Sequence, residues 1–475
     1  MTFVPSWRAA LCVAFLWSGL TSLSASADED TPLRALPEIT STNGVLTATL
    51  EAKEQSIKLG RLHFDGMTYN GDYAGPVLRA YPGDVLRIKL INHLSEPTNL
   101  HFHGLHASPL AKGDNMHIVV EPGQSFDYDV AIPPSQPPGL YWYHTHIHGR
   151  AQDQISSGLS GTLIVEGLEK QLPQIASLKQ HIFVLKDHTF AEADNPDIKN
   201  LHKLAQTMNG QLFSTLTMRP HETQLWRFSN QSANLYFHIA LKGHRFRIIA
   251  TDGVVTNKEI VADVLDLGPS ARIEALVDAG DAGTYDIVSE HTMTGTGDQL
   301  VLERTLGRVT VTGKATTSLA TLSTFPDKKD LRASTINERR TFTLTQANDD
   351  KNFFMNGKHF DHTRVDTRVP LGNIEEWTVK NDTDDMHVFH IHQIHFQVAA
   401  INGKPQPFNG YVDAVRVPER GDVTLLMPFT EPQIVGTFMY HCHVLKHEDG
   451  GMMANIEVYD PKQDHDVTTP HHHAP

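Results

Sequence analysis

Four short histidine clusters have spacings that would place imidazoles side by side. On a β-strand, residues i and i+2 point to the same face, so a His-x-His motif offers two imidazoles to one metal ion. Because the chain has 29 histidines, some such motifs arise by chance, and only their combination indicates a metal centre. The clusters are His101-Phe102-His103, His144-Thr145-His146, His387-Val388-Phe389-His390-Ile391-His392 and His441-Cys442-His443.

The fourth cluster predicts a second kind of site on the opposite face of its strand. Its two histidines point one way and Cys442 points the other way, toward His447 and Met452 in the following loop. With His387 as a second imidazole, these residues form the ligand set of a blue-copper electron-transfer site. The strand would then connect this copper to the neighbouring histidines through two peptide units.

Together the four motifs resemble those of the multicopper oxidases, the family of laccases and bacterial copper-efflux oxidases. The resemblance covers nearly all of the chain after residue 27 and implies four copper ions. The type 1 copper would be bound by His387, Cys442, His447 and Met452. A trinuclear cluster between the first and third domains would hold a type 2 copper on His101 and His390. Its type 3 pair would be bound by six further ligands: His103, His144, His146, His392, His441 and His443.

The same resemblance implies an activity. A donor would give single electrons to the type 1 copper, and dioxygen would be reduced to water at the trinuclear cluster. Asp114, after the first motif, and Glu448, directly after His447, match acidic residues that serve some members as proton relays, although the loop leading to Asp114 is longer here. Five further histidines lie outside the ligand register and are expected to be hydrogen-bonded or exposed: His106, His117, His148, His238 and His395.

Three segments with one shared pattern must position these motifs. Segments 82–92, 220–230 and 371–381 each begin with a turn, alternate apolar with polar residues and end in Asn. Such alternation between turns predicts strands, and the domain-sized spacing predicts three related β-sandwiches. The resemblance implies that these are cupredoxin-like Greek-key domains, so the fold is all-β. An Asn-Gly pair precedes each segment: Asn70-Gly71, Asn209-Gly210 and Asn356-Gly357.

We divide the chain on this pattern. The predicted units are a signal peptide at 1–27, domains at 28–168, 169–320 and 321–460, and a histidine-containing tail at 461–475. In the middle domain, Phe237-His238-Ile239-Ala240 corresponds to Phe389-His390-Ile391-His392, but Ala240 replaces a ligand. The middle domain is therefore predicted to bind no copper and to act as a spacer. The tail is either a solvated terminus or a metal-scavenging segment.

Composition limits the other function classes. With 475 residues, 40 basic and 55 acidic, the chain has a formal charge of −15, which argues against a nucleic-acid partner. Its two cysteines exclude a disulfide framework and any four-cysteine metal site. Arg8, a short apolar run and Ala25-Ser26-Ala27 match a Sec-type signal peptide, which predicts a periplasmic or secreted protein without a membrane anchor. Because one chain would supply the whole interdomain cluster, a monomer is expected.

The sequence leaves the electron donor open. Asp384, Asp385 and Met386 precede His387, and Glu448-Asp449 follow His447, so an acidic rim favours a cationic donor such as Cu(I). However, the Met-rich insert of many copper-efflux oxidases is missing, and a phenolic or aromatic donor, or another metal, remains open. A non-catalytic exported copper-binding or tolerance protein is the alternative from another class. A copper nitrite reductase is disfavoured because it needs no His-Cys-His bridge to a binuclear pair.

Overall fold

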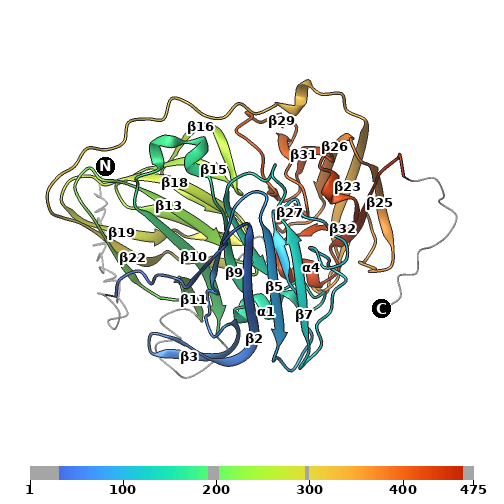
Figure 1. The fold of residues 1–475 in the computed structure, drawn as a ribbon, viewed down its shortest axis with the longest axis horizontal. Helices are drawn as coiled ribbons and strands as arrows, with labels where there is room; N and C mark the ends of the chain where they lie inside the picture. The colour runs from blue at the N-terminus through green and yellow to red at the C-terminus, as the bar shows by residue number, and fades with distance from the viewer. Residues whose placement is uncertain (1–30, 191–202, 295–298, 464–475) are drawn as a thin grey trace, which may run out of the picture.

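Three pairs of stacked β-sheets follow one another along the chain. This computed structural model describes residues 31–190, 203–294 and 299–463. The predicted signal peptide and most of the predicted tail lie outside the described residues. Figure 1 shows the first pair in blue and teal below the centre, the second in green and yellow on the left, and the third in orange and red on the right.

The strand order within the sheets is similar in the three pairs. In the first pair the order is β3 (Leu62–Tyr69), β2 (Val45–Leu59), β5 (Val85–Asn92), β7 (Ser125–Ala131), against β1 (Glu38–Thr40), β4 (Val77–Ala80), β9 (Ser160–Val165), β8 (Gly139–His144), β6 (His101–His103). In the second it is β11 (Leu204–Met208), β10 (Gln180–Thr189), β13 (Thr223–Asn230), β18 (Arg272–Asp278), β15 (Phe246–Thr251), β16 (Val254–Ala262), against β12 (Ser214–Met218), β22 (Arg304–Val311), β19 (Gly283–Ser289), β14 (Phe237–Leu241), β17 (Leu265–Leu267). In the third it is β24 (Phe353–Met355), β23 (Glu338–Gln346), β26 (Ile374–Asn381), β31 (Asp422–Pro428), β28 (Gln397–Ile401), β29 (Lys404–Pro405), against β25 (Val365–Pro370), β33 (Met453–Tyr459), β32 (Gly436–Cys442), β27 (His387–Ile391), β30 (Ala414–Val417). A small ribbon joins β20 (Thr292–Thr294) to β21 (Gln299–Val301).

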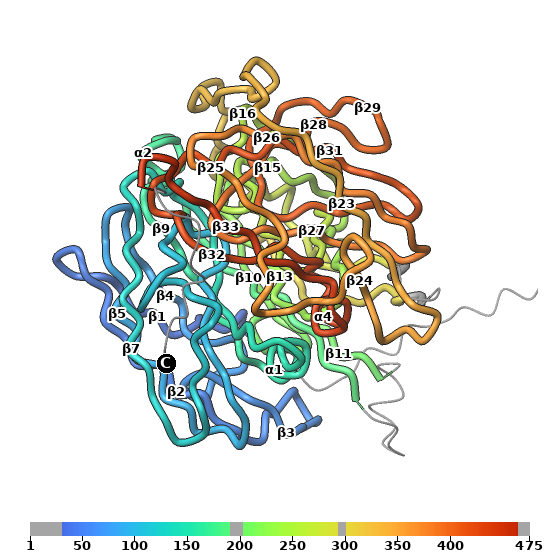
Figure 2. The backbone as a smooth tube through the Cα atoms, turned by 90° about the vertical axis from the view of Figure 1, so that its right-hand side faces the viewer, coloured from blue at the N-terminus to red at the C-terminus, as the bar shows by residue number. Residues whose placement is uncertain are grey.

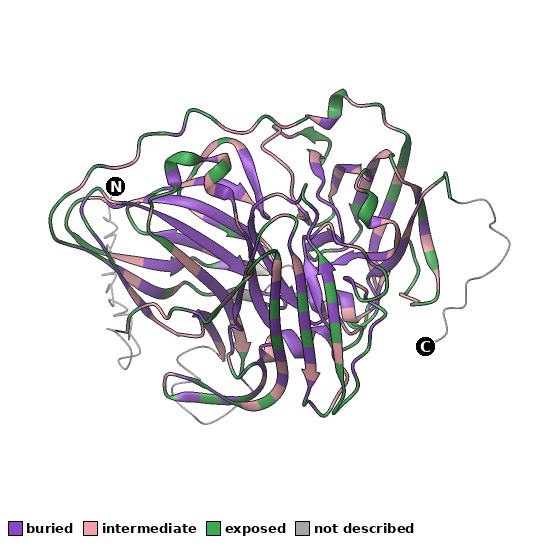
Figure 3. Ribbon diagram, viewed as in Figure 1, coloured by how far each residue is buried: buried purple, intermediate pink, exposed green. Residues whose placement is uncertain are grey.

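The predicted repeat segments form one equivalent strand in each pair. Strands β5, β13 and β26 each pair in parallel with the strand before them in their sheet, and antiparallel with the strand after. The apolar positions of these strands, such as Leu86, Trp226 and Trp377, are fully buried between the two sheets. Figure 3 shows this buried interior in purple. Each such side chain contributes about 1.5–3 kcal/mol of burial free energy, so the alternation fixes which face of the strand is the core.

The asparagine that ends each repeat strand makes the same set of hydrogen bonds. The side-chain amides of Asn92, Asn230 and Asn381 each donate to two or more backbone carbonyls across the end of the sandwich, at 2.7–3.4 Å. Each Oδ1 accepts the N–H of the residue two positions later, at 2.9–3.0 Å. All three asparagines are at most 3% exposed. The asparagine shared by the three repeat segments therefore joins neighbouring chain segments by buried hydrogen bonds at the end of each sandwich. We call this arrangement the buried clasp.

The Asn-Gly pairs form tight turns that require left-handed backbone. Asn70, Asn209 and Asn356 have φ of 55°, 51° and 52°, and the following glycines have φ of 79°, 74° and 69°. Asparagine and glycine are the residues that adopt this conformation most readily. Each asparagine Oδ1 also accepts a backbone N–H from the strand that pairs in parallel with the repeat strand, which is β2, β10 or β23, at 2.7–2.8 Å. The turn thereby sets the register of that strand.

Short helices and one long connection join the sandwiches. Residues 312–337 cross the top of the molecule from the second pair to the third (Figure 1) and contain η2 (Leu331–Ala333), so the predicted boundary at 320/321 falls within this connection. The predicted boundary at 168/169 falls in α2 (Leu168–Gln171), which precedes η1 (Pro173–Ile175). η3 (Pro432–Ile434) directly precedes β32. The helix after β32, α4 (Leu445–Asp449), packs beside α1 (Ala151–Ser157), as Figure 2 shows. Within the described ranges, no helix has the length and apolar character needed to cross a membrane.

Replacing Asn230 with Ala tests the buried clasp. The change leaves the carbonyls of Leu235 and Leu267 without their amide donor, and each unsatisfied buried group costs about 1–3 kcal/mol. We expect the free energy of unfolding, measured by urea denaturation, to fall by about 2–4 kcal/mol. Gln55→Ala, which removes one surface hydrogen bond, is the control and should change it by about 0.5 kcal/mol or less. Equal effects of the two substitutions would contradict the clasp.

Candidate metal centre

Two pairs of adjacent strands bring the histidine motifs together. In the first sandwich, β6 runs antiparallel to β8, so His101 lies opposite His144. In the third, β27 runs antiparallel to β32, so His390 lies opposite His441 and Phe389 opposite Cys442. Since side chains alternate between faces, the histidines of each strand pair point to one side. The two sandwiches place these sides against each other.

The first group of donor atoms lies inside the third sandwich. The Nδ1 atoms of His387 and His447 are 3.0 Å apart, and Cys442 Sγ lies 3.4 Å and 3.6 Å from them. The hydroxyl of Thr383 lies 2.8 Å from Nε2 of His387 and so holds that ring with Nδ1 toward the thiol. Met452 is buried beside them, and its carbonyl accepts the N–H of Cys442 at 3.1 Å. Two imidazoles and a thiol thus converge on one point.

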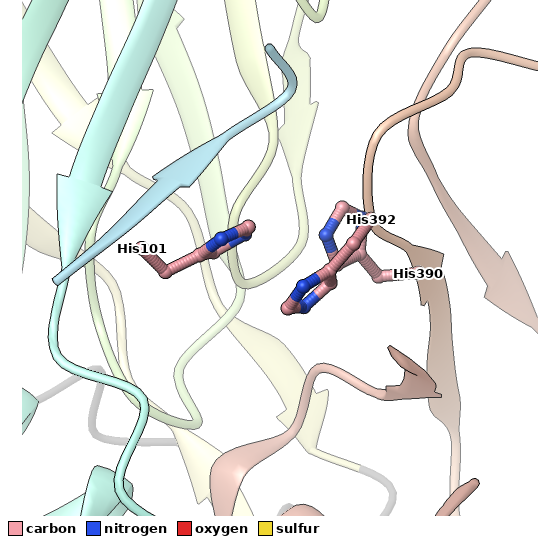
Figure 4. A group of neighbouring side chains, drawn as sticks. All are labelled: His101, His390 and His392. Carbon is pink, nitrogen blue, oxygen red and sulfur yellow. The ribbon is translucent and has the colours of Figure 1, made fainter. Parts of the chain in front are cut away.

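The second assembly contains eight histidines between the first and third sandwiches. Figure 4 shows His101, from β6, facing His390 and His392 from β27 and the residue after it. The ring of His101 stacks on that of His392 with centroids 3.9 Å apart, and the ring of His103 stacks on that of His390 at 3.8 Å. Nε2 of His441 lies 3.2 Å from Nε2 of both His146 and His392. The remaining members, His144 and His443, have ring centroids 5.5 Å apart.

Hydrogen bonds orient several of these rings so that one nitrogen is left for a metal. Nδ1 of His144 donates to the carbonyl of Thr145 at 2.7 Å, and Nδ1 of His390 donates to the carbonyl of Asp413 at 2.7 Å. The other nitrogen of each ring is buried and has no hydrogen-bond partner. Both ring nitrogens of His443 are likewise without one. A buried polar atom without a hydrogen-bond partner lowers the free energy of unfolding by about 1–3 kcal/mol, and binding to a metal ion would remove this penalty.

The electrostatics of the assembly favour neutral imidazole, the form that binds metals. All eight histidines are at most 3% exposed. Burial, followed by the proximity of the other imidazoles, lowers the pKa of His101, His103 and His392 well below its ordinary value. Burial also lowers the pKa of His441 to about 4. Neutral imidazoles with a thiol nearby suit copper or zinc, so the residues fit a resident transition metal.

Sequence reasoning missed Asp413 and Arg272, which hold this assembly from outside. Asp413 Oδ1 accepts a 3.1 Å hydrogen bond from Nε2 of His103, and Nδ1 of that ring has no hydrogen-bond partner. Arg272, from β18 of the middle sandwich, donates two hydrogen bonds to the same carboxylate. Both residues are at most 1% exposed. No motif marks them, because they come from a loop before β30 and from the domain that lacks histidine ligands.

The middle sandwich therefore does more than separate its neighbours. Arg272 Nε donates to the carbonyl of Leu140 at 3.3 Å, and Glu274 accepts the N–H of Leu140 at 3.2 Å. Two residues of β18 thus hold the beginning of β8, the strand that carries His144. His238 lies apart from these contacts, 3.3 Å from Asp266 and 26% exposed. Among the described residues, the groups of converging metal-donor side chains include none from β10 to β22.

Asp114 and Glu448 both lie against the histidine assembly. Asp114 Oδ2 is 3.0 Å from Nδ1 of His101 and accepts a 2.7 Å hydrogen bond from Gln393. Burial raises the pKa of Asp114 to about 8, although its hydrogen bonds oppose this. Glu448 Oε2 lies 3.0 Å from Nδ1 of His441, and burial raises the pKa of Glu448 to about 7. Each carboxyl is fully buried, Asp114 against His101 and Glu448 against His441.

The acidic residues around His387 and His447 do not form one exposed rim. Asp384 is exposed but pairs with Arg420, which holds the pKa of Asp384 below its ordinary value. Asp449 accepts three backbone N–H groups at the start of α1, and Glu448 points to the other assembly. Asp385 remains near the first group, 3.9 Å from Nε2 of His447, with half-buried Met386 after it.

The histidines outside the ligand register differ in their surroundings. His106 Nε2 lies 2.7 Å from Nδ1 of His395, whose Nε2 donates to the carbonyl of Asp252 at 2.8 Å. His395 is also 3.6 Å from the carboxylate of Asp413, so this pair borders the assembly without joining it. His117 and His148 are exposed.

Known proteins are similar to this chain in sequence and in fold. Three family models, each described as multicopper oxidase, match residues 51–170, 170–307 and 335–462. The chain is 27% identical to the multicopper oxidase mco of Staphylococcus aureus, over 88% of this chain and 89% of that one. It is 24% identical to the cell division protein FtsP of Pectobacterium atrosepticum, over 96% of this chain and 98% of the relative.

Solved structures agree with these relatives. A multicopper oxidase from Campylobacter jejuni, described as a metallo-oxidase, superposes with a TM-score of 0.76 at 26% identity, covering 91% of this chain and 96% of the other. A laccase-like multicopper oxidase from Ochrobactrum sp., with oxidase activity towards lignin model compounds, has a TM-score of 0.76 at 25% identity, covering 90% of this chain and 100% of the other. The chain belongs to the multicopper oxidase family and has three cupredoxin-like domains, as the sequence predicted. Membership in this family implies copper binding and oxidoreductase chemistry.

Asp413→Asn tests the support of the histidine assembly. The amide removes the negative charge beside Arg272 and places an NH₂ group where Asp413 Oδ2 accepts from that guanidinium, so the oxygen that accepts from His103 is held less firmly and the orientation of the His103 ring becomes less fixed. Loss of such an outer hydrogen bond typically weakens metal affinity by about 10–100-fold, and we expect a loss of this size in copper retention during dialysis against a chelator. Asp384→Asn, on the surface, should retain copper as the unchanged protein does. Equal retention by both variants would contradict the role of Asp413.

Proposed function

We propose that this protein is a copper-dependent oxidase that couples one-electron oxidation of a donor to the four-electron reduction of dioxygen to water. The observation that carries the proposal is the convergence of His387, Cys442 and His447 on one side of a strand whose next residues join the eight-histidine assembly. The copper ions would supply electron transfer at the first group and dioxygen reduction at the second. The chain supplies the ligands, their orientation and the exclusion of bulk water.

We assign the ligands as the family resemblance implies. Type 1 copper is assigned to His387, Cys442 and His447, with Met452 as the weak axial ligand. Type 2 copper is assigned to His101 and His390, whose Nε2 atoms are buried and lack partners. The type 3 pair is assigned to the remaining six histidines: His103, His144, His146, His392, His441 and His443. Together these two sets of donors would bind four copper ions.

Cys442 connects the two sets through covalent bonds. Its thiol belongs to the first group, and the residues on either side of it, His441 and His443, belong to the second. The carbonyl of Cys442 also lies 3.1 Å from Nδ1 of His441, which adds a hydrogen-bonded route between thiol and imidazole. An electron therefore has a short through-bond path, buried at every residue.

Reduction of dioxygen to water consumes protons, and two buried carboxyls are placed to deliver them. Asp114 contacts His101, and Glu448 contacts His441 and lies 3.7 Å from Nε2 of His146. Their pKa values of about 8 and about 7 let each carboxyl bind and release a proton near neutral pH. We propose both as proton-relay residues.

For the donor we propose Cu(I), with phenolic compounds as the second candidate. Asp385, which lies 3.9 Å from Nε2 of His447, and Met386, which directly precedes His387, supply an acidic and a thioether group at the first site, and this favours a cationic donor. Of the similar solved structures, one is described as a metallo-oxidase and another as a laccase-like oxidase with activity towards lignin model compounds. We further propose export by the predicted signal peptide to the periplasm or the medium, with the protein acting there as a monomer.

Oxygen uptake by the copper-loaded protein tests the proposal, with Cu(I) compared with dimethoxyphenol as donor. We expect rapid uptake with Cu(I) and slower uptake with the phenol, together with the blue colour of a copper–thiolate bond. Cys442→Ser should remove the colour and lower uptake by about 10³-fold or more, because the thiolate ligand and the electron path are both lost. A blue protein without oxygen uptake from either donor would contradict the oxidase and leave a copper-binding protein.

Glu448→Gln tests proton delivery. The amide keeps the shape of the side chain but cannot release a proton, so turnover should fall by about 10²-fold, measured as oxygen uptake at saturating donor. Copper content and blue absorbance should not change. Glu121→Gln, on the exposed surface, serves as the matched control. Full turnover by the Glu448→Gln variant would contradict the proposed role of Glu448 in proton delivery.

A further inference from the structure

The turn after the third histidine cluster has a strained backbone. Gln393, which directly follows His392, has φ of +60°, a left-handed conformation that glycine and asparagine adopt readily and glutamine rarely does. The corresponding turn after the first cluster has Gly104, with φ of +87°. Glycine would therefore satisfy the backbone at position 393 without strain. Because strained residues cluster at functional sites, a glutamine at this position indicates a use for its side chain.

The side chain of Gln393 reaches a carboxylate in another domain. Its Nε2 donates to Asp114 Oδ2 at 2.7 Å, although the two residues are 279 positions apart along the chain. Both residues are fully buried, so bulk water does not compete for the contact. Both oxygens of Asp114 lie 3.0–3.1 Å from Nδ1 of His101, which is assigned to the type 2 copper. The amide of Gln393 therefore acts on this ligand through Asp114.

The other hydrogen bonds of Asp114 come from its own domain. The N–H of Phe102 donates to Oδ1 at 3.0 Å, and the N–H of Asp114 donates to the carbonyl of Ser108 at 2.8 Å. These bonds hold one oxygen and the backbone, and they leave Oδ2 to Gln393 and His101. Without the amide, the carboxyl group is free to rotate about its Cβ–Cγ bond. Gln393 therefore determines the plane in which the carboxyl faces His101.

The turn after the first cluster faces a carboxylate of the third domain in the same way. A Cβ on Gly104 would lie 2.5 Å from Oδ2 of Asp413, so this turn admits no side chain. The carboxylate of Asp413 is held instead by Arg272 from the middle domain. Each of the two turns thus faces a buried carboxylate of the other domain, and one donor side chain from another domain holds each carboxylate. In the third domain the turn itself supplies that donor, which explains the glutamine.

We propose that Gln393 is a positioning residue that holds Asp114 against His101 across the boundary between the first and third domains, and that its strained backbone persists for this contact. The proposal rests on the proposed function in one respect, since an effect on turnover requires that Asp114 delivers protons. The geometry that it predicts needs neither copper nor turnover.

Two substitutions remove the contact and relieve the strain together. Gln393→Gly has no side chain, and Gln393→Asn keeps an amide that is one carbon too short to reach Asp114. Since the relieved strain offsets the lost hydrogen bond, we expect the melting temperature of either copper-free variant to fall by no more than about 2 °C. The matched control is His221→Gly, because His221 is exposed in the middle domain and has φ of +63°. A much larger fall in the Gln393 variants would mean that the glutamine is kept for stability, and would overturn the proposal.

Turnover shows whether Gln393 acts through Asp114. We expect Gln393→Gly to lower kcat for oxygen uptake about tenfold and to leave KM for the donor unchanged, because the donor is oxidised at the other group of ligands. In the background of Asp114→Asn, the same substitution should lower kcat by less than about twofold. His221→Gly should have the kcat of the unchanged protein. Independent, multiplicative effects of Gln393→Gly and Asp114→Asn would overturn the proposal.

Crystal structures of the copper-free proteins separate this proposal from the function on which it rests. In Gln393→Gly we expect the carboxyl of Asp114 to rotate, so that Oδ2 moves beyond hydrogen-bonding distance of His101 Nδ1. The type 2 signal in electron paramagnetic resonance should change accordingly once copper is bound. A carboxyl that stays in place in this variant would overturn the role of Gln393 and leave the oxidase untouched. A rotated carboxyl in a protein that shows no oxygen uptake before substitution would support the contact and overturn the oxidase alone.

Discussion

Eight almost fully buried imidazoles must lie within a few ångströms of one another and stay neutral, and the rest of the structure is arranged around that constraint. Burial and mutual repulsion both oppose protonation, so the rings present lone pairs to one another with few donors to satisfy them. In the absence of metal such an arrangement is costly. Resident copper ions would raise the free energy of unfolding, because a ligand that binds only the folded state shifts the equilibrium toward that state.

The three domains share the task of meeting this constraint. The first and third supply the imidazoles from two antiparallel strand pairs and from the residues that directly follow those strands. The middle domain supplies Arg272, which pairs with Asp413 behind His103 and also holds Leu140 at the beginning of β8. A buried guanidinium beside a cluster of neutral imidazoles is tolerable because the carboxylates of Asp413 and Asp252 both lie beside it. The arrangement explains why a domain without copper ligands is nevertheless part of the centre.

Strand periodicity and ligand spacing were sufficient to predict three β-sandwiches and to place the histidines of each His-x-His motif on one face, whereas the cupredoxin-like topology was implied by the family resemblance. Both are local properties: side chains alternate on any strand, and the repeated Asn and Asn-Gly positions form the same clasps and turns in each domain. Asp413, Arg272 and Gln393 could not be found this way, since each acts across a domain boundary and none lies in a motif. The acidic rim was wrong as a surface feature for the same reason. Which way Glu448 and Asp449 point depends on α4 packing against α1, which spacing alone does not show.

The most direct test of the central claim is the number of donor electrons consumed for each dioxygen molecule, measured with copper-loaded protein and an assay for hydrogen peroxide. The buried path from Cys442 to the histidine assembly predicts four electrons for each dioxygen, with no peroxide released at any stage. A value of two electrons with accumulating peroxide would contradict the account, because it would mean that the eight histidines do not act together as one oxygen-reducing centre.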